Sequence, residues 1–431
     1  MTVSDPAARS SGALLVALVC AAQVLVQIGA YFWPALLPGL MPAWSLSNSE
    51  AGWITAIFYG AYMVSVPVLV TLTDRIDAKR VYLFGVGCTV AAHLLFGLLA
   101  EDFWSALALR ALAGIGWAGT YMTGLKLLAD KVDARLMSRA VTGHAASIGV
   151  AGALSFSCAG LLADVYGWRS AFLAAGASAA AAWLLIAVRV RGAAPSTGEK
   201  PALFDFRPVF RNRSAMAYSI GYCVHTLEMN ALRGWGVAFL GFVAAGTGAG
   251  GAPLSATLVL TGLGLIGTAA SVLGNEAAMR IGRRRLIVCA MLGSVVVGGS
   301  IGFLGPLSYP LAVGLLLCYG FVVWLDSSAL TAGTAGTADP ARRGATLAVH
   351  STLGYAGGFV GPLLVGVILD ALGGMSRAAW GAAFLAVAVL MLLALAAFGL
   401  LRPRELAGDR ETEKRTPAAP KGKSRGERTA G

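Results

Sequence analysis

Charged side chains are scarce in this chain, and their scarcity excludes an ordinary soluble protein. Only 13% of its 431 residues are charged and 57% are hydrophobic, whereas about a quarter of a soluble domain is charged. The apolar residues form runs of the roughly 20 residues that a helix needs to cross a bilayer. These runs lack the alternation of a β-barrel strand, and only helices or closed barrels span lipid. The sequence therefore predicts an all-α membrane protein.

Several motifs that would indicate other kinds of membrane protein are also missing. There is no GxxxxGK[ST] and no loop long enough for an ATPase domain, which argues against a primary pump. There is no HExxH, and the four histidines are scattered singly, which argues against an intramembrane metalloprotease. The six cysteines also occur singly, and we interpret them as small apolar residues. We therefore expect no enzyme activity, no catalytic residue, no metal and no cofactor.

The apolar runs predict twelve spans. They fall in two sets of six, which predicts two pseudo-symmetric six-helix bundles. The spans are placed near 13–37, 51–72, 81–100, 104–128, 140–162, 170–188, 217–242, 255–277, 286–304, 311–332, 345–369 and 378–401.

Basic residues give an independent test of this topology. With the N-terminus inside, 28 of the 33 Lys and Arg residues fall on the cytoplasmic side and two fall outside. Membrane proteins retain Lys and Arg in cytoplasmic loops. The same retention explains the net charge of +12, so no nucleic-acid partner is needed. We expect both termini to be cytoplasmic.

The chain then divides into five parts. We expect a cytoplasmic N-terminal tail at 1–12, a first bundle at 13–190, a polar linker at 191–213 and a second bundle at 214–401. Residues 402–431 are rich in Arg, Lys, Glu and Pro, so we expect a disordered cytoplasmic tail. The first apolar run is too long for a signal-peptide core, and we interpret it as a retained span.

The two halves resemble one another at an offset of about 205 residues. TDRIDAKRV at 73–81 aligns with MRIGRRRL at 279–286. His144 and Asp164 bracket the fifth span with the same spacing as His350 and Asp370 around the eleventh. Such repeats are typical of transporters whose substrate site lies between the halves at mid-membrane.

These motifs resemble those of the major facilitator superfamily. VTLTDRIDAKRVYL is similar to that family's gating signature between spans 2 and 3, with matches at Asp74, Arg75, Lys79 and Arg80. Val70 and Asp77 stand where the family usually has glycines. The resemblance implies twelve helices, alternating access and a cavity lined by spans 1, 4, 7 and 10.

Two further segments carry the resemblance. RALAGIGWAG in span 4 and GGFVGPLLVG in span 11 are similar to the family's other signatures, although span 5 lacks the proline. The chain is also loosely similar to bacterial cyanate- and nitrate-type carriers. Nitrate carriers use arginines in spans 2 and 8, which this chain lacks, so nitrate is not implied.

Arg110 is the first ionisable residue that we place inside the membrane. Such residues are costly there and often functional. Helical spacing puts Trp117 and Tyr121 on roughly the same face, which suits an amphipathic anionic ligand. A structural bond from Arg110 to the carbonyls of a neighbouring span is the alternative.

Span 7 carries three more ionisable residues. His225 and Glu228 are three residues apart and share a face, with Glu228 near mid-membrane. We interpret them as a proton-coupling pair and Arg233 as a substrate ligand. The alternative is a permanently closed Glu228–Arg233 ion pair.

Other polar residues lie on spans 1 and 10. Gln23, Gln27 and Tyr31 recur at four-residue steps, as substrate ligands or as partners of neighbouring helices. For Asp326 we favour a structural pairing with a basic residue in the loops.

Together these features predict a secondary active transporter in a bacterial inner membrane. We expect a small solute, such as an organic anion or a similar metabolite, and proton-coupled symport. A drug or metabolite efflux carrier is the alternative, and a non-transporting membrane sensor is a more distant one. The expected partners are a small-molecule substrate and the lipid bilayer, and we expect a monomer.

Overall fold

The structure is a computed structural model that describes residues 6–73, 75–129, 131–192, 206–249, 254–406 and 409. All regular structure within these ranges is helical, which confirms the all-α prediction there. The helices before the linker are α1 (Pro6–Gln27), α2 (Phe32–Ala43), α3 (Asn48–Leu72), α4 (Ala78–Leu99), α5 (Phe103–Ala118), α6 (Tyr121–Ala129), α7 (Ala134–Tyr166) and α8 (Trp168–Arg189).

The remaining helices begin with α9, which lies inside the predicted linker of 191–213. They are α9 (Arg207–Arg211), α10 (Arg213–Thr247), α11 (Ala256–Ile281), α12 (Arg283–Leu304), α13 (Tyr309–Leu325), α14 (Ser327–Thr337), α15 (Arg343–Ala371) and α16 (Arg377–Leu401), with short 3-10 turns at Gly305–Leu307 and Pro340–Arg342.

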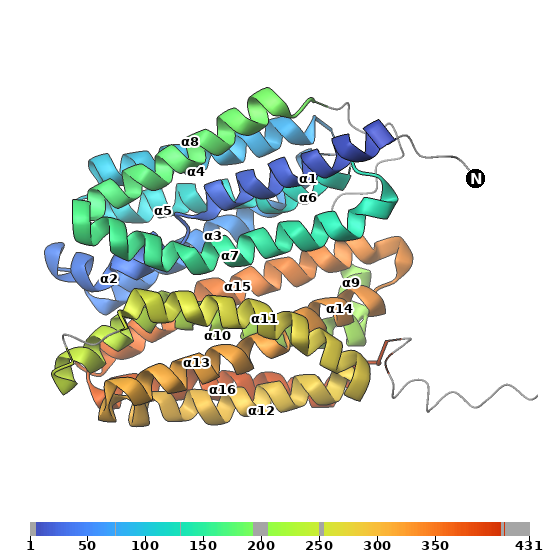
Figure 1. Ribbon diagram of the computed structural model, residues 1–431. Coiled ribbons are helices and arrows are strands. Elements are labelled where there is room, and N and C mark those ends of the chain that lie inside the picture. The colour runs from blue at the N-terminus through green and yellow to red at the C-terminus, as the bar shows by residue number, and fades with distance from the viewer. Residues whose placement is uncertain are drawn as a thin grey trace, which may run out of the picture.

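The two sets of helices lie on opposite sides of the molecule. Figure 1 shows α1–α8 gathered above and α10–α16 below, with their axes roughly along one direction. We call the end of the bundle where α1 begins the terminal end and the opposite end the far end. The helices before and after the linker form two halves, which meet mainly where α3 packs on α15 and α7 packs on α11.

Ten helical segments in the described part of the chain are long and apolar enough to cross a membrane. The two predicted spans outside this set are 104–128 and 217–242. The first corresponds to α5 and α6, which carry Arg110, and the second to α10, which carries Glu228 and Arg233. Charged side chains lower the mean hydropathy of a segment. The two segments that are less apolar than the other spans are therefore the ones that carry the ionisable residues for which we expect a function.

Three predicted spans are interrupted near their middle. The first breaks between α1 and α2, the fourth at Gly119–Thr120 between α5 and α6, and the tenth at Asp326 between α13 and α14. A break leaves backbone carbonyls without intrahelical partners. At Gly119 the backbone packs closely against α4, because an added Cβ would lie 2.6 Å from the Gly85 Cα.

The far end is closed by contacts between the halves. The Asp370 carboxylate in α15 accepts hydrogen bonds from the Asn48 backbone N–H (3.0 Å), the Asn48 Nδ2 (2.7 Å) and the Ser49 backbone N–H (2.6 Å) at the start of α3. Towards mid-bundle, Tyr62 of α3 stacks on Tyr355 of α15 with ring centroids 3.6 Å apart.

A second seam between the halves runs along α7 and α11. Ser157 Oγ lies 2.6 Å from Thr261 Oγ1, and the Ser157 backbone N–H also donates to that oxygen. An added Cβ on Gly149 would lie 2.8 Å from Thr268 Oγ1, so the backbone there approaches the other half closely. Both seams therefore join the halves between mid-bundle and the far end.

We expect Asp370→Ala to open the far end. The variant removes three hydrogen bonds to a charged group, each worth about 1.5–3 kcal/mol. A cysteine introduced at Thr55, which is buried beneath this closure, should react at least about tenfold faster with an impermeant thiol reagent applied to the far-end side of membrane vesicles.

Asp164→Ala is the matched control, because Asp164 is the repeat equivalent of Asp370 and is exposed at the end of α7. Both variants are made in a background without the six native cysteines. Equal labelling rates in the Asp370 variant and the control would show that this closure does not hold the far end shut.

Candidate functional site

Arg110 is buried in the middle of the molecule. Its side chain is 2% exposed, and Nη1 donates to the Ala30 carbonyl at 3.3 Å. That carbonyl lies in the break between α1 and α2. The guanidinium also stacks over the Phe58 ring, 4.4 Å from its centroid, whereas Nε has no partner among the described residues. The structural bond that we weighed as an alternative is present, but it uses only part of the guanidinium.

Arg233 approaches the same region from α10. Its Nη1 donates to the Tyr31 hydroxyl at 2.9 Å. The Arg233 Cζ lies 5.0 Å from the Tyr31 ring centroid and 4.7 Å from the Trp324 ring centroid. Arg233 is half-buried, and it joins span 7 to spans 1 and 10 across the interface of the halves.

Tyr31 is the centre of this group. Its ring stacks on Phe156 at 5.3 Å and meets Trp117 edge-on at 6.3 Å. The Trp117 Nε1 is buried and has no hydrogen-bond partner in the ranges that the structure describes. We call Tyr31, Arg110, Trp117 and Arg233 the arginine cluster.

The arginine cluster is rich in donors and poor in acceptors. Neither Arg110 nor Arg233 forms an ion pair with any residue that the structure describes. A buried charge without a counter-ion is costly, and planar guanidinium groups bind carboxylates with two parallel hydrogen bonds. The geometry therefore suits an anionic ligand with an apolar or aromatic body.

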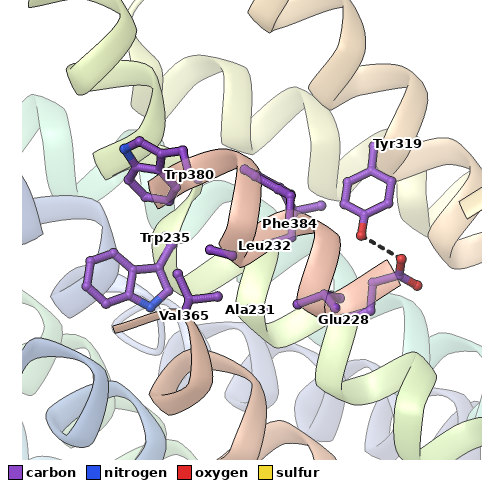
Figure 2. A pocket seen from close by; sticks show the side chains of 11 residues that line it. Glu228, Ala231, Leu232, Trp235, Tyr319, Val365, Trp380 and Phe384 are labelled. Atoms are coloured by element: carbon purple, nitrogen blue, oxygen red, sulfur yellow. Dashed lines mark hydrogen bonds between the residues drawn. The ribbon is translucent and has the colours of Figure 1, made fainter. Parts of the chain in front are cut away.

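Glu228 lies on a different face of α10, among apolar side chains. It is 1% exposed. Its Oε1 accepts hydrogen bonds from the Tyr319 hydroxyl (2.5 Å) and from Ser294 Oγ, and Oε2 has no partner in the described part of the chain. Figure 2 shows the carboxylate and the Tyr319 ring turned toward one another beside a narrow pocket with Trp235 and Trp380 in its wall.

The alternative of a closed Glu228–Arg233 pair is wrong in this structure. Positions five apart on a helix differ by about 140°, and each side chain has other partners. His225 does not bond Glu228 either. Its Nδ1 lies 2.9 Å from the Asp326 Oδ1, and both side chains are buried. The two atoms are at ion-pair distance without the alignment of a hydrogen bond.

Asp326 therefore has a partner, but not the loop residue that we favoured. It stands at the break between α13 and α14, where the chain turns its carboxylate toward His225. Sequence reasoning missed this pair because 101 positions separate the two residues. Helical spacing identifies only neighbours on the same helix. Asp326 has no other signal in the sequence than its charge within an apolar run.

Tyr121 does not belong to the arginine cluster. The helix breaks between Trp117 and Tyr121, so the spacing rule fails there. Tyr121 instead lies parallel to His144 of α7, with ring centroids 6.1 Å apart. In the other half His350 stacks on Tyr222 at 4.1 Å and lies 3.0 Å from Thr334 Oγ1.

Gln23, Gln27 and Lys79 lie within the first half. Gln23 and Gln27 are buried, and the Gln23 Oε1 lies 3.4 Å from the Tyr82 hydroxyl, as in helix-to-helix pairing. Lys79 Nζ donates to the Ala187 carbonyl at 2.8 Å. Arg75 and Arg80 are exposed, and Asp74 lies outside the described residues.

Comparisons with known proteins agree with this architecture. The family described as Major Facilitator Superfamily matches residues 19–358 and 234–428. Human protein spinster homolog 1 is 28% identical over 411 residues, covering 86% of this chain and 75% of that protein.

Two solved structures show the same fold. A bacterial homolog of the human lysosomal transporter Spinster, in an inward-facing and unoccupied conformation, superposes with a TM-score of 0.74 at 16% identity, covering 93% of this chain and 98% of that one. The nucleoside transporter NupG gives a TM-score of 0.73 at 14% identity and covers 90% of this chain and 99% of that one.

Proposed function

The chain belongs to the Major Facilitator Superfamily, and we propose that it moves a small organic anion across a membrane by proton-coupled alternating access. The observation that carries the proposal is the arginine cluster, where two arginines from different halves converge without a carboxylate from the described residues. An interface between the halves is also where a two-state movement exposes a ligand first to one side and then to the other.

We place twelve spans in two six-helix bundles, at the ranges that the apolar runs predict. In this arrangement α1 with α2, α5 with α6, and α13 with α14 each make one interrupted span. The terminal end faces the cytoplasm of a bacterial cell, because the basic loops lie there. The contacts between α3 and α15 then close the outer side, and the protein faces inward.

The anion is bound by the arginine cluster in this proposal. Arg110 and Arg233 pair with its charge, Trp117 Nε1 donates a further hydrogen bond, and the surrounding rings contact its apolar body. Gln27 is the last residue of α1, at the break that carries Tyr31, and we keep it as an additional ligand. A nucleoside, which NupG is named for, is neutral and leaves both guanidinium groups unpaired.

Protons bind at Glu228 in this proposal, with His225 and Asp326 as its neighbours. Burial favours the neutral form of a carboxylic acid, and a nearby cation favours the charged form. A group whose surroundings alternate between these two conditions binds a proton on one side and releases it on the other. The break in span 1 carries Tyr31 of the arginine cluster, and the break in span 10 carries Asp326. Movement at these breaks therefore changes the surroundings of both groups.

A ligand screen tests the proposed substrate class. The purified protein is heated with a panel of small carboxylates, phosphorylated metabolites, nucleosides and amines. An anion at 100 times its Kd should raise the unfolding free energy by about 2.7 kcal/mol, and neutral or cationic members should not. A nucleoside or an amine that stabilises the protein while every anion fails would contradict the proposal.

A further inference from the structure

A basic pocket lies at the terminal end, away from the arginine cluster. It is open to solvent and lies between the start of α10 and the end of α16. Four arginines line it in two pairs, Arg211 with Arg213 and Arg402 with Arg404. The pairs are far apart in sequence and converge only in the folded chain. Figure 1 shows α9, which carries Arg211, at the same end of the molecule as the N-terminus.

The start of the tail that we expected to be disordered, residues 402–406, is ordered, because hydrogen bonds fix the backbone that carries these arginines. The Arg404 backbone N–H donates to Ser214 Oγ at 3.1 Å, and its carbonyl accepts from the Tyr218 hydroxyl at 2.9 Å. Asn212 Oδ1 caps α10, and Asn212 Nδ2 donates to the Thr337 carbonyl at 2.8 Å. The pocket is therefore built by the fold and does not depend on a chance meeting of surface side chains.

The four positive charges of the pocket are close together and exposed to solvent. None of the four side chains is ion-paired within the part of the chain that the structure describes. Like charges repel, so the arrangement gains from an anion held between them. Guanidinium groups match phosphate oxygens in geometry as well as in charge.

The pocket also has an apolar border. Leu400 in the last turn of α16 lines it and is 77% exposed, and Phe210, next to Arg211, is 57% exposed. An exposed leucine at the end of a membrane helix lies where lipid tails meet headgroups. Basic pockets between helix ends at this depth are typical headgroup sites.

We propose that this pocket binds the phosphate headgroup of an anionic membrane lipid. The arginines hold the phosphate oxygens, and the acyl chains lie along the exposed side of α16. Free phosphate offers the same oxygens, but it leaves Leu400 and Phe210 uncovered. The proposal does not depend on the identity of the transported solute.

The test measures the binding of dioleoyl phosphatidylglycerol to the full-length protein in a neutral detergent. Arg213→Gln with Arg404→Gln removes two charges from the pocket. Arg189→Gln with Arg191→Gln removes two exposed charges from the terminal end of the other half. The pocket variant should bind the lipid about thirtyfold more weakly, and the control should bind as wild type does.

A second pocket variant, Arg211→Gln with Arg402→Gln, guards against a folding defect in the first. Its loss of lipid binding should be similar, with an unchanged melting temperature in the absence of lipid. Equal losses in the pocket variants and the control would overturn the proposal, because they would show only general attraction to a basic surface. Inorganic phosphate that displaces the lipid at millimolar concentration would overturn the assignment to a lipid.

Discussion

Arg110→Gln is expected to weaken binding of the transported anion by at least about 30-fold. Truncating one partner of a buried charge pair costs about 2–5 kcal/mol or more, and the guanidinium of Arg110 is 2% exposed. The measurement is equilibrium binding of an anion from the ligand screen to purified protein. Arg110→Lys should recover only part of the affinity, because an ammonium group lacks the planar pair of donors.

Arg169→Gln is the control for this substitution. Arg169 also stacks on an aromatic ring, Trp168, with Cζ 4.6 Å from its centroid, but its side chain is 43% exposed and lies near Glu101. Its loss should leave anion binding unchanged. If Arg110 only anchors the Ala30 carbonyl, Arg110→Gln will lower the melting temperature while the folded protein still binds the anion at full affinity. That result would remove Arg110 from the substrate site.

Glu228→Gln is expected to abolish accumulation driven by a pH gradient while exchange of substrate for substrate continues. Glutamine keeps the side-chain shape and an oxygen for Tyr319 and Ser294, so the fold should survive. It cannot bind and release a proton in the working pH range, so the pH gradient no longer drives accumulation of the substrate. The measurement compares uphill uptake with counterflow in the same liposomes.

Glu276→Gln is the matched control, because Glu276 is exposed on α11. It should retain both activities. A Glu228→Gln protein that folds and still accumulates substrate with normal pH dependence would show that coupling occurs elsewhere, for which the His225–Asp326 pair is the next candidate. A variant that loses folded protein and every activity together would indicate a structural role.

The helical class and the two arginines of the candidate site could be predicted from the sequence, because both depend on local patterns. Apolar runs indicate membrane helices. An arginine within such a run indicates a functional site, because placing its charge in the membrane is costly. Arg110 and Arg233 are both identified in this way, and the structure places Arg110 at the Ala30 carbonyl and Arg233 at the Tyr31 hydroxyl.

The partners within the site could not be predicted in the same way. Tyr121 was placed with Arg110 by helical spacing, but the break at Gly119–Thr120 sends it toward His144. Gly119 at this break packs closely against Gly85 of α4, which is a tertiary contact. The same limit applies to Asp326, whose partner lies on a distant span.

One alternative could have been rejected from the sequence alone. Glu228 and Arg233 are five residues apart, and that spacing does not place two side chains on one helical face. The structure confirms that the two groups point to different neighbours. Counting helical positions is therefore informative within an unbroken helix such as α10 and fails across a break.

The most direct test of proton-coupled anion transport is simultaneous recording of proton and solute flux. Purified wild-type protein is placed in liposomes, an anion from the ligand screen is added outside, and the internal pH and the internal anion are followed together. With the outside made acidic, the anion should accumulate above its external concentration and protons should enter with it. Collapse of the pH gradient by a protonophore should stop both fluxes. Anion entry that only equilibrates, with no proton movement beyond that of protein-free liposomes, would contradict proton-coupled anion transport.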